Sequence, residues 1–547
     1  MSRSQSVVSD TLGQSELGPN NSVSIAIFGQ ALIAQADNWR AAYRITLLNA
    51  GIFLFLALAM FALEPRSLVV ILSAPALFFF GGMLSFFLMV RSGGDLAAIS
   101  WFVLGASVYF GMGAVAGGLH VHPYSDFLFA DDTSYLIRVN LLNACSVFIV
   151  LATAYPLANM GRMKVSQYDM QQENIERLLR NIFPYIVGIS AIGVGLKYAL
   201  FPVAESLVIR SMAAKAYLII PSCFLLLGLL RHSIGWQLKL LAYSIFLLEI
   251  LNGLICFTKY QIILVTMALI IGMWIGVAKR SAIFLVMSFM IVSSVFAIIN
   301  PIVSLGRSHI DYDPYNNTVE TRLKILTDAG YAFYLDKGSQ EDVDSGNGVR
   351  PQKFKSNYSE IFTGDIAEMS TLEARMKAVG RRFDVVSIQG YLINEYNSGR
   401  RGHTLADFWA TMVPRVFWPG KPIMTRFGVE LNSQYYFRAG HSGHNISSTA
   451  PTFSAEAYWN YGVSGVLIIS VLLGLVAGWL TRCWQYAMVG RDPAFFLIAF
   501  PVAIWVSFVE SWVVATYLGE FIIFVVILLF ARAFFALMRT LRKRARS

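Results

Sequence analysis

The sequence predicts an all-α, polytopic membrane protein with about twelve transmembrane helices and one large, partly helical loop near its carboxyl end. Of the 547 residues, 56% are hydrophobic and only 14% are charged, whereas a soluble domain is about 25% charged. The mean hydropathy is +0.57. Many apolar runs also reach about 20 residues, the length that a helix needs to cross a bilayer.

Window hydropathy divides the chain into spans and connections. We expect a cytoplasmic tail at 1–43, a bundle of about nine spans at 44–304, a large loop at 305–462 and the last spans with a basic tail at 463–547. The tail is polar and Ser-rich without an apolar core, which argues against a cleaved signal peptide. The expected spans are roughly 44–63, 68–90, 97–118, 137–158, 182–201, 211–230, 236–257, 260–278, 282–304, 463–481, 494–513 and 517–538.

The basic residues alternate between the two sides of the predicted membrane. Cytoplasmic loops carry excess Lys and Arg, so the arginine-rich side is inside, with both termini. The short loop 120–134 on the other side is acidic. The rule also explains the net charge of +10 without a nucleic-acid partner. The inner basic residues are Arg40, Arg44, Arg91, Arg162, Lys164, Arg177, Arg180, Arg231, Lys279, Arg280, Arg482, Arg491, Arg539, Arg542, Lys543, Arg544 and Arg546.

The large loop, 305–462, lies outside by this alternation, and a connection of that length is typically functional or disordered. The charged stretch 336–350 lacks aromatic residues and is predicted to be disordered. Residues 366–397 show apolar side chains at spacings of three and four, which predicts a helix. On it, Arg381 shares a polar face, whereas Arg382 has valines and an alanine as its helical neighbours.

Two further segments of the loop have recognisable patterns. A second helix is expected from Thr404, with Asp407 three residues later as a variant of the capping box. Its aromatic residues suit either the membrane interface or packing on the bundle. Prolines then stiffen 413–422. Finally, the polar stretch 440–462 leads to the tenth span.

The candidate chemistry is phosphate binding by cations on the outer side. The guanidinium of arginine donates two parallel hydrogen bonds to phosphate, so an outer cationic site beside the membrane fits a lipid pyrophosphate. That group leaves readily in glycosyl transfer, and cations stabilise its developing charge. The alternative is that these cations are solvated loop charges. The outer cations are Lys259, Arg307, Arg375, Arg382, Arg415, Lys421 and Arg426.

Glycosyl transfer also needs a group that activates the acceptor hydroxyl. Glu456, His441 and His444 lie in a suitable segment, and His444 is a candidate base, hydrogen-bond donor or bystander. Tyr458 and Tyr461 could stack on sugars or anchor the chain at the interface. Walker, HExxH, CxxC and GxSxG motifs are absent, and the HxH at 120–122 is too weak to predict a metal site. No metal and no cofactor are expected.

Three stretches resemble the Wzy-type polymerases of bacterial O-antigen and exopolysaccharide, the oligosaccharide repeat-unit polymerases. They are GRRFD at 380–384, VPRVFWPGKP at 413–422 and AEAYWNYGVSGVL at 455–467. The layout of many spans with one large periplasmic loop near the carboxyl end is similar too. Family members often carry an arginine near a mid-chain span, where this chain has Lys259 in FTKYQ.

The resemblance implies a C-type glycosyltransferase architecture in the bacterial inner membrane. Such an enzyme transfers a growing glycan from undecaprenyl pyrophosphate to a new lipid-linked repeat unit, without nucleotide sugar or metal. Its partners would be the donor, the acceptor, membrane lipid and a chain-length regulator protein. Carried onto this chain, Arg382, Arg415 and Lys421 would bind pyrophosphate or glycan, while Glu456 and Tyr458 would line the acceptor side.

The predicted site therefore combines residues from both arguments. Two other readings stay open: an O-antigen ligase, which shares the layout but uses a lipid A core acceptor, and a lipid-linked oligosaccharide flippase. The predicted catalytic residues are Arg382, Arg415, His444 and Glu456, and the predicted substrate-binding residues are Lys259, Arg307, Lys421, Tyr458 and Tyr461.

The two neighbouring arginines of the first loop helix allow a matched test. We expect Arg382→Ala and Arg415→Ala each to shorten the polymer at normal protein abundance, because each removes a cation that stabilises the leaving pyrophosphate. Arg381→Ala should have a milder effect, because its helical neighbours form a polar, solvated face. Gel electrophoresis of surface glycan measures this. Full-length glycan from either of the first two variants contradicts that assignment, and equal effects at 381 and 382 contradict the assigned helix faces.

Overall fold

The computed structural model describes residues 19–92, 94–119, 134–159, 169–199, 219–256, 259–275, 385–413, 450–488, 492–511 and 513–544, with scattered residues at 284–327 and at 418 and 431. This part is almost entirely helical, and its only β-pairing is a single bridge between Thr452 and Glu510. The predicted all-α class is therefore confirmed for the described residues. Side chains of α1 are described from residue 38 onward.

Seven helices or helical runs in the described residues are long and apolar enough to cross a membrane. They include α1 (Pro19–Leu63), α2 (Leu68–Arg91), α6 (Ser134–Asn159), α10 (Trp236–Ile255), α19 (Phe453–Met488) and α21 (Gly519–Arg544), together with the run Ala98–Gly118. That run consists of α3 (Ala98–Ala106), η1 (Ser107–Met112) and α4 (Gly113–Gly118).

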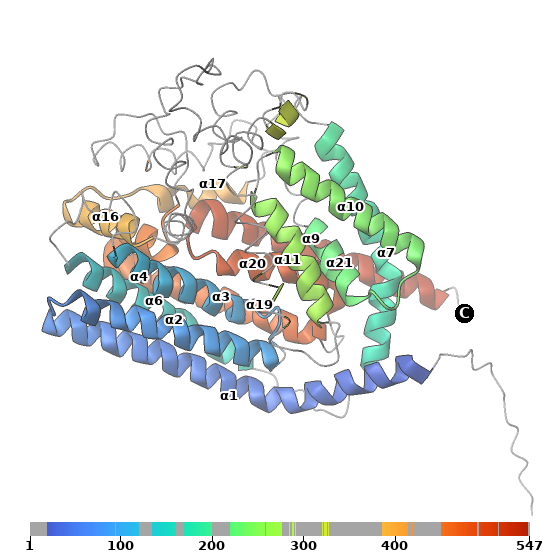
Figure 1. Cartoon of the computed structure of the whole chain (residues 1–547), viewed down its shortest axis with the longest axis horizontal. Coiled ribbons are helices and arrows are strands. Elements are labelled where there is room, and N and C mark those ends of the chain that lie inside the picture. Colours follow the sequence, from blue (N-terminus) through green and yellow to red (C-terminus); the bar gives the residue numbers. More distant parts are fainter. Residues whose placement is uncertain are drawn as a thin grey trace, which may run out of the picture.

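Three shorter apolar helices in the described residues lie beside α10 on one side of the bundle (Figure 1). They belong to α7 (Asp169–Ala199), α9 (Ile220–Leu229) and α11 (Lys259–Ile275). The count of twelve spans stays a prediction, since most of 282–304 lies outside the described residues.

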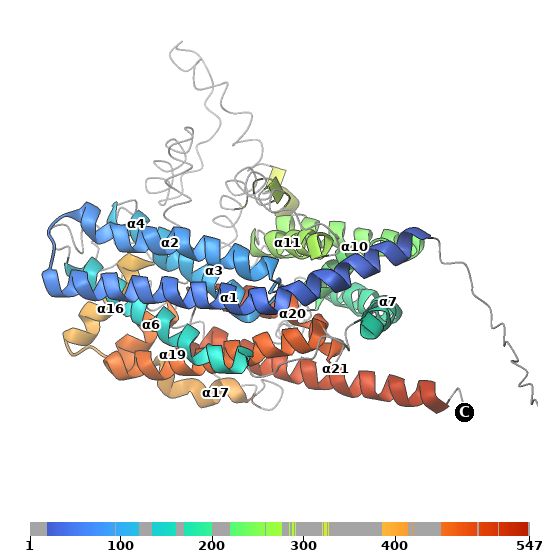
Figure 2. The same ribbon diagram turned by 90° about the horizontal axis from the view of Figure 1, so that it is seen from below.

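The helices are apolar on both their buried and their exposed faces. In α2, Phe78 and Met89 are buried, whereas Leu77 and Phe80 are exposed. A helix that is apolar all round is typical of a membrane span. This chain is therefore a helical membrane protein. Figure 2 shows α1, α2, α6 and α19 running side by side, with α16 (Val386–Asn397) at one end of the bundle, which we call the loop end.

Helix α19 turns back on itself at Gly462. Gly462 has φ +63° and ψ −146°, a left-handed conformation that glycine adopts at low cost. A Cβ on Gly465 would lie 2.3 Å from the carbonyl oxygen of Ala457, although eight residues of straight helix span about 12 Å. Residues 453–461 therefore pack against the start of 463–488 and run in the opposite direction. We call them the re-entrant segment.

Contacts with α6 confirm this reversal. Ser454 donates a hydrogen bond to Asn143 of α6 at 3.2 Å, and Gly474 packs on Val150 of the same helix. Asn143 and Val150 are about 10 Å apart along α6, whereas Ser454 and Gly474 would be about 30 Å apart in a straight helix. Only a turn between them lets both contacts form.

The predicted span 494–513 is not one continuous helix. After η5 (Pro493–Leu497), helix α20 (Ala499–Ser507) has nine residues, about 14 Å, which is too short to cross a hydrocarbon core of about 30 Å. The chain leaves the helix at Phe508 and re-enters it in the π-helix η6 (Val513–Leu518), which continues into α21. Window hydropathy missed this break because it averages composition and does not detect backbone geometry.

The break lies beside the start of the re-entrant segment. The backbone N–H of Phe453 donates to the carbonyl of Val509 at 3.2 Å, next to the Thr452–Glu510 bridge. Backbone groups inside a membrane protein need such internal partners. The two interruptions therefore stabilise each other, and both lie toward the middle of the bundle.

Small residues allow the close packing of α6 on α19. A Cβ on Gly474 would lie 1.8 Å from Thr153 Oγ1, and one on Gly478 would lie 2.8 Å from the Ala154 carbonyl. Both glycines advance along α19 as their partners advance along α6, so the two helices are parallel here. Glycines four residues apart commonly let membrane helices approach closely.

This contact predicts a large effect of bulk at Gly474. Gly474→Leu should lower stability by about 1–3 kcal/mol, because the side chain must displace α6. Thermal unfolding of the detergent-solubilised protein measures it. Val471→Leu, at an exposed position one turn earlier, is the matched control and should leave the midpoint unchanged. Equal midpoints for the two variants would contradict the packing.

Candidate functional site

Polar side chains gather inside the bundle near the loop end. They come from α6, from α16, from the 3₁₀-helix η4 (Thr404–Asp407) and from the re-entrant segment. All of them are buried among apolar helices. Because buried polar groups need hydrogen-bond partners, the connections among these side chains determine how the four elements fit together.

A pair of side-chain amides forms one half of this network. Asn143 of α6 donates to Gln389 of α16 at 3.0 Å, and Gln389 donates back to Asn143 at 2.8 Å. Gln389 also donates to the hydroxyl of Thr452 at 2.6 Å. Thr452 in turn accepts from the N–H of Ala455 at 3.2 Å, which makes it the N-cap of the re-entrant segment. The amide pair thus fixes where that segment begins.

Glu456 forms the other half. It is fully buried and accepts hydrogen bonds on both carboxylate oxygens: one from the hydroxyl of Thr404 at 2.6 Å, the other from the backbone N–H of Val513. Val513 is the first residue of η6, and negative charge is favourable at a helix N-terminus. Glu456 therefore connects the re-entrant segment, η4 and the helix that follows the break.

Thr404 has a different role from the predicted cap. We expected it to begin a helix as half of a capping box with Asp407. The helix does begin there, as η4 followed by α17 (Phe408–Met412), but the N-cap position is His403 and has no side-chain bond. The Thr404 hydroxyl instead donates to Glu456 and accepts from Asn460 at 3.0 Å. A buried carboxylate is a stronger hydrogen-bond acceptor than a neutral group, so the Thr404 hydroxyl donates its hydrogen bond to Glu456.

Two half-buried tyrosines, Tyr396 and Tyr458, and the exposed Tyr461 lie outside this network, together with exposed arginines. Tyr458 donates to Asn397 at 3.2 Å, and its ring meets Tyr396 edge to face at 5.1 Å. The guanidinium of Arg401 lies 5.3 Å from the centre of the Tyr396 ring, a cation–π distance. Tyr461 is 54% exposed. Aromatic faces and guanidinium groups together can bind a sugar that carries an anion.

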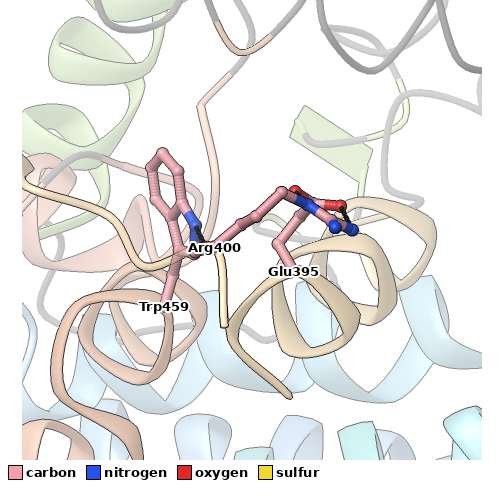
Figure 3. A network of polar contacts seen from close by, with 3 residues as sticks. All are labelled: Glu395, Arg400 and Trp459. Carbon is pink, nitrogen blue, oxygen red and sulfur yellow. Dashed lines mark hydrogen bonds and ion pairs between the residues drawn. The ribbon is translucent and has the colours of Figure 1, made fainter. Parts of the chain in front are cut away.

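Arg400 and Arg401 differ in their partners. Figure 3 shows Arg400 paired with Glu395 by two hydrogen bonds, of 2.6 and 2.9 Å, while its carbonyl accepts from the indole of Trp459 at 3.0 Å. The carboxylate raises the pKa of Arg400 and offsets its charge. Arg400 therefore joins α16 to the re-entrant segment. Arg401 makes no ion pair within the part of the chain that the structure describes.

The predicted site residues are only partly placed. Glu456, Tyr458 and Tyr461 lie together on the re-entrant segment, with the carboxylate inward and Tyr461 outward. Lys259 is the first residue of α11, but its side chain lies outside the described residues, as do the remaining predictions. Those are Arg307, Arg382, Arg415, Lys421 and His444. The expected helix 366–397 is described only from residue 385, and α16 begins at Val386.

Sequence reasoning missed the amide pair, Asn143 and Gln389, that fixes the start of the re-entrant segment. Gln389 stands between Val385 and Ile393 on an apolar helix face, and Asn143 lies within an apolar span. A polar residue in either place indicates a buried hydrogen bond. Nothing local pairs them, since they are 246 residues apart. Arg401 carried no signal that distinguished it from Arg400.

A further buried carboxylate lies in α10. Glu249 is 1% exposed and accepts a hydrogen bond from Gln261 of α11. Gln261 is therefore one partner of this intramembrane glutamate. Within the described residues, no group of three or more His, Cys, Asp or Glu side chains is arranged to hold a metal ion.

Comparisons with known proteins identify no relative. The chain matches no family model, no curated protein and no solved structure. The functional argument therefore rests on the residues themselves.

The amide pair predicts coupled stability effects. Gln389→Leu and Asn143→Leu should each cost about 1–3 kcal/mol, because one leaves the buried Nδ2 of Asn143 without its acceptor and the other leaves the buried Oε1 of Gln389 without its donor. The double variant should cost clearly less than the sum. Thermal unfolding in detergent gives all three values. Asn394→Leu, at an exposed position on the same helix, is the control, and additive effects would exclude the pairing.

Proposed function

We propose that this chain is a membrane glycosyltransferase that polymerises undecaprenyl-pyrophosphate-linked repeat units into O-antigen or exopolysaccharide at the periplasmic face of the bacterial inner membrane. One observation carries the proposal most directly. The stretch AEAYWNYG, on which part of the family resemblance rests, builds the re-entrant segment. In that segment a buried carboxylate, the half-buried Tyr458 and the exposed Tyr461 lie within a few residues of each other.

In the proposed reaction, the acceptor sugar's hydroxyl oxygen attacks the anomeric carbon of the donor glycan. The bond between that carbon and the pyrophosphate oxygen breaks, and undecaprenyl pyrophosphate leaves with the bonding electrons. The acceptor's proton passes to a base, for which His444 is the candidate. Arg382, Arg415 and Lys421 stabilise the charge on the leaving group. These four assignments rest on the sequence.

We assign Glu456 a positioning role within this reaction. Both of its oxygens already accept hydrogen bonds, and the side chain has no exposure. It therefore acts through the elements that it holds together, and Tyr458 and Tyr461 face the acceptor. Glu456→Gln supplies only one acceptor oxygen, so a buried donor loses its partner.

A flippase for lipid-linked oligosaccharide is the second candidate. The broken helix at Phe508 and the re-entrant segment favour it, because transporters commonly bind substrate where membrane helices are interrupted. A ligase is a third reading, since it shares the layout. All three proteins act on lipid-linked glycan. They differ in which surface glycan disappears when the gene is deleted.

Deleting the gene in its host and separating surface glycan on a gel tests the proposal. A polymerase deletion should leave single repeat units attached, because ligation continues without polymerisation. Complementation with the wild-type chain should restore the ladder. The Glu456→Gln variant should shorten it at normal abundance, since the re-entrant segment loses one of its fixing bonds.

The alternatives give different patterns in the same experiment. Loss of a flippase or a ligase should remove single repeats as well as polymer. A deletion that leaves no repeats would therefore overturn the polymerase. A full-length ladder from Glu456→Gln would overturn the positioning role alone.

A further inference from the structure

The loop end carries a patch of two arginines and three tyrosines: Arg138, Tyr396, Arg401, Tyr458 and Tyr461. Neighbours connect them. Arg401 lies over the Tyr396 ring, and Tyr396 meets Tyr458. Arg138 of α6 is close enough to interact electrostatically with Tyr458. A Cβ on Gly462, next to Tyr461, would lie 2.6 Å from the Tyr396 hydroxyl. The five side chains thus form one surface.

Within the described residues, no acidic side chain pairs with the arginines of this patch. Arg138 and Arg401 are both exposed, and neither forms an ion pair within the described part of the chain. Arg400, only one residue from Arg401, is by contrast held by Glu395 (Figure 3). Among the described residues nothing neutralises these two guanidinium groups, and they flank two tyrosine rings. Guanidinium groups bind carboxylates through paired hydrogen bonds, while the apolar face of a pyranose can pack on an aromatic ring.

A pair of tryptophans lies deeper along α19 than the patch. Trp409 and Trp418 stack at 5.3 Å, and Trp409 is 52% exposed. Trp418 packs against the cluster of Leu405 and Ala410, as does Ile469. Ile469 is seven residues, about 10 Å, along α19 from the turn at Gly462. The patch at that turn therefore lies nearer the loop end than the tryptophans.

We propose that the patch binds an acidic glycan, with Arg401 and Arg138 holding sugar carboxylates and Tyr396 and Tyr458 stacking on the sugar rings. This inference rests on the proposed function for taking the ligand to be a glycan. It adds a chemical class of substrate, repeat units that contain uronic acid or a comparable carboxylate, which the polymerase proposal does not specify.

A matched pair of ligands tests this directly. The full-length chain in nanodiscs is titrated with a tetramer of galacturonic acid and with its methyl ester, which has the same rings without charge. We expect the acid to bind at least about tenfold more tightly. Arg401→Ala and Arg138→Ala should each weaken binding of the acid about tenfold, the scale of one charge-assisted contact, with little change for the ester.

Three further variants complete the design. Tyr458→Ala should weaken binding of both ligands. Tyr458→Phe should keep the affinity for the ester, because the ring remains. Arg91→Ala removes one positive charge at the carboxyl end of α2, far from the loop end. It should change the affinity for neither ligand. Equal affinity for acid and ester, or unchanged acid binding in Arg401→Ala and Arg138→Ala, would overturn the proposal. Displacement of the acid by inorganic pyrophosphate at comparable concentration would reassign the patch to phosphate.

The proposed function and this inference can fail separately. A gene deletion that removes single repeats overturns the polymerase, and acid-selective binding in nanodiscs would still support the patch. Conversely, the deletion strain could retain single repeats while acid and ester bind equally. That outcome would support the polymerase and overturn the acidic ligand.

Discussion

The structure depends on how two interrupted membrane helices satisfy each other's backbone. An N–H or C=O group without a partner is costly inside a bundle. At the break after α20, the carbonyl of Val509 accepts from Phe453, and the carbonyl of Phe508 accepts from the Tyr517 hydroxyl at 2.7 Å. The N–H of Val513 donates to Glu456. The backbone N–H and C=O groups at the break thus find hydrogen-bond partners elsewhere in the chain. The break and the re-entrant segment therefore form as one unit.

The positions of the functional side chains follow from that unit. Glu456 and Asn460 are four residues apart, so they share one face of the short helix, and both bond to η4. Tyr458 and Tyr461 are three residues apart and share another face, on which Tyr458 is half-buried against the core and Tyr461 is exposed. A single short helix therefore separates a buried linking network from the proposed binding surface. The turn at Gly462 is what brings that surface to the loop end.

Hydropathy predicted the continuous helices well and the interrupted ones poorly. The predicted span 68–90 agrees with α2 within one residue at its carboxyl end, and 137–158 agrees with α6 within three. Residues 453–461 were taken as part of a loop, because Glu456, Trp459 and Asn460 lower the apolar average. The structure places them in a helix inside the bundle, where hydrogen bonds from distant residues satisfy the polar groups. Those partners have no local pattern to reveal them.

The packing around Phe453 bears on the choice between a glycosyltransferase and a flippase. Phe453 is fully buried at the base of the re-entrant segment, and it contacts Phe102, Phe110 and Tyr517 at 6.1–6.3 Å between ring centres. Phe110 and Tyr517 lie in the two π-helices, η1 and η6, irregularities that are frequent at functional sites.

This aromatic cluster packs at the base of the re-entrant segment, beneath the polar network. On the flippase alternative, these rings would have to part during each cycle to let a polar glycan through. On the proposed polymerase, glycan is handled from one face, and the packed rings keep the re-entrant segment in place. The packing therefore agrees better with the proposed polymerase than with the flippase, and it gives the broken helices a supporting role beneath the proposed site.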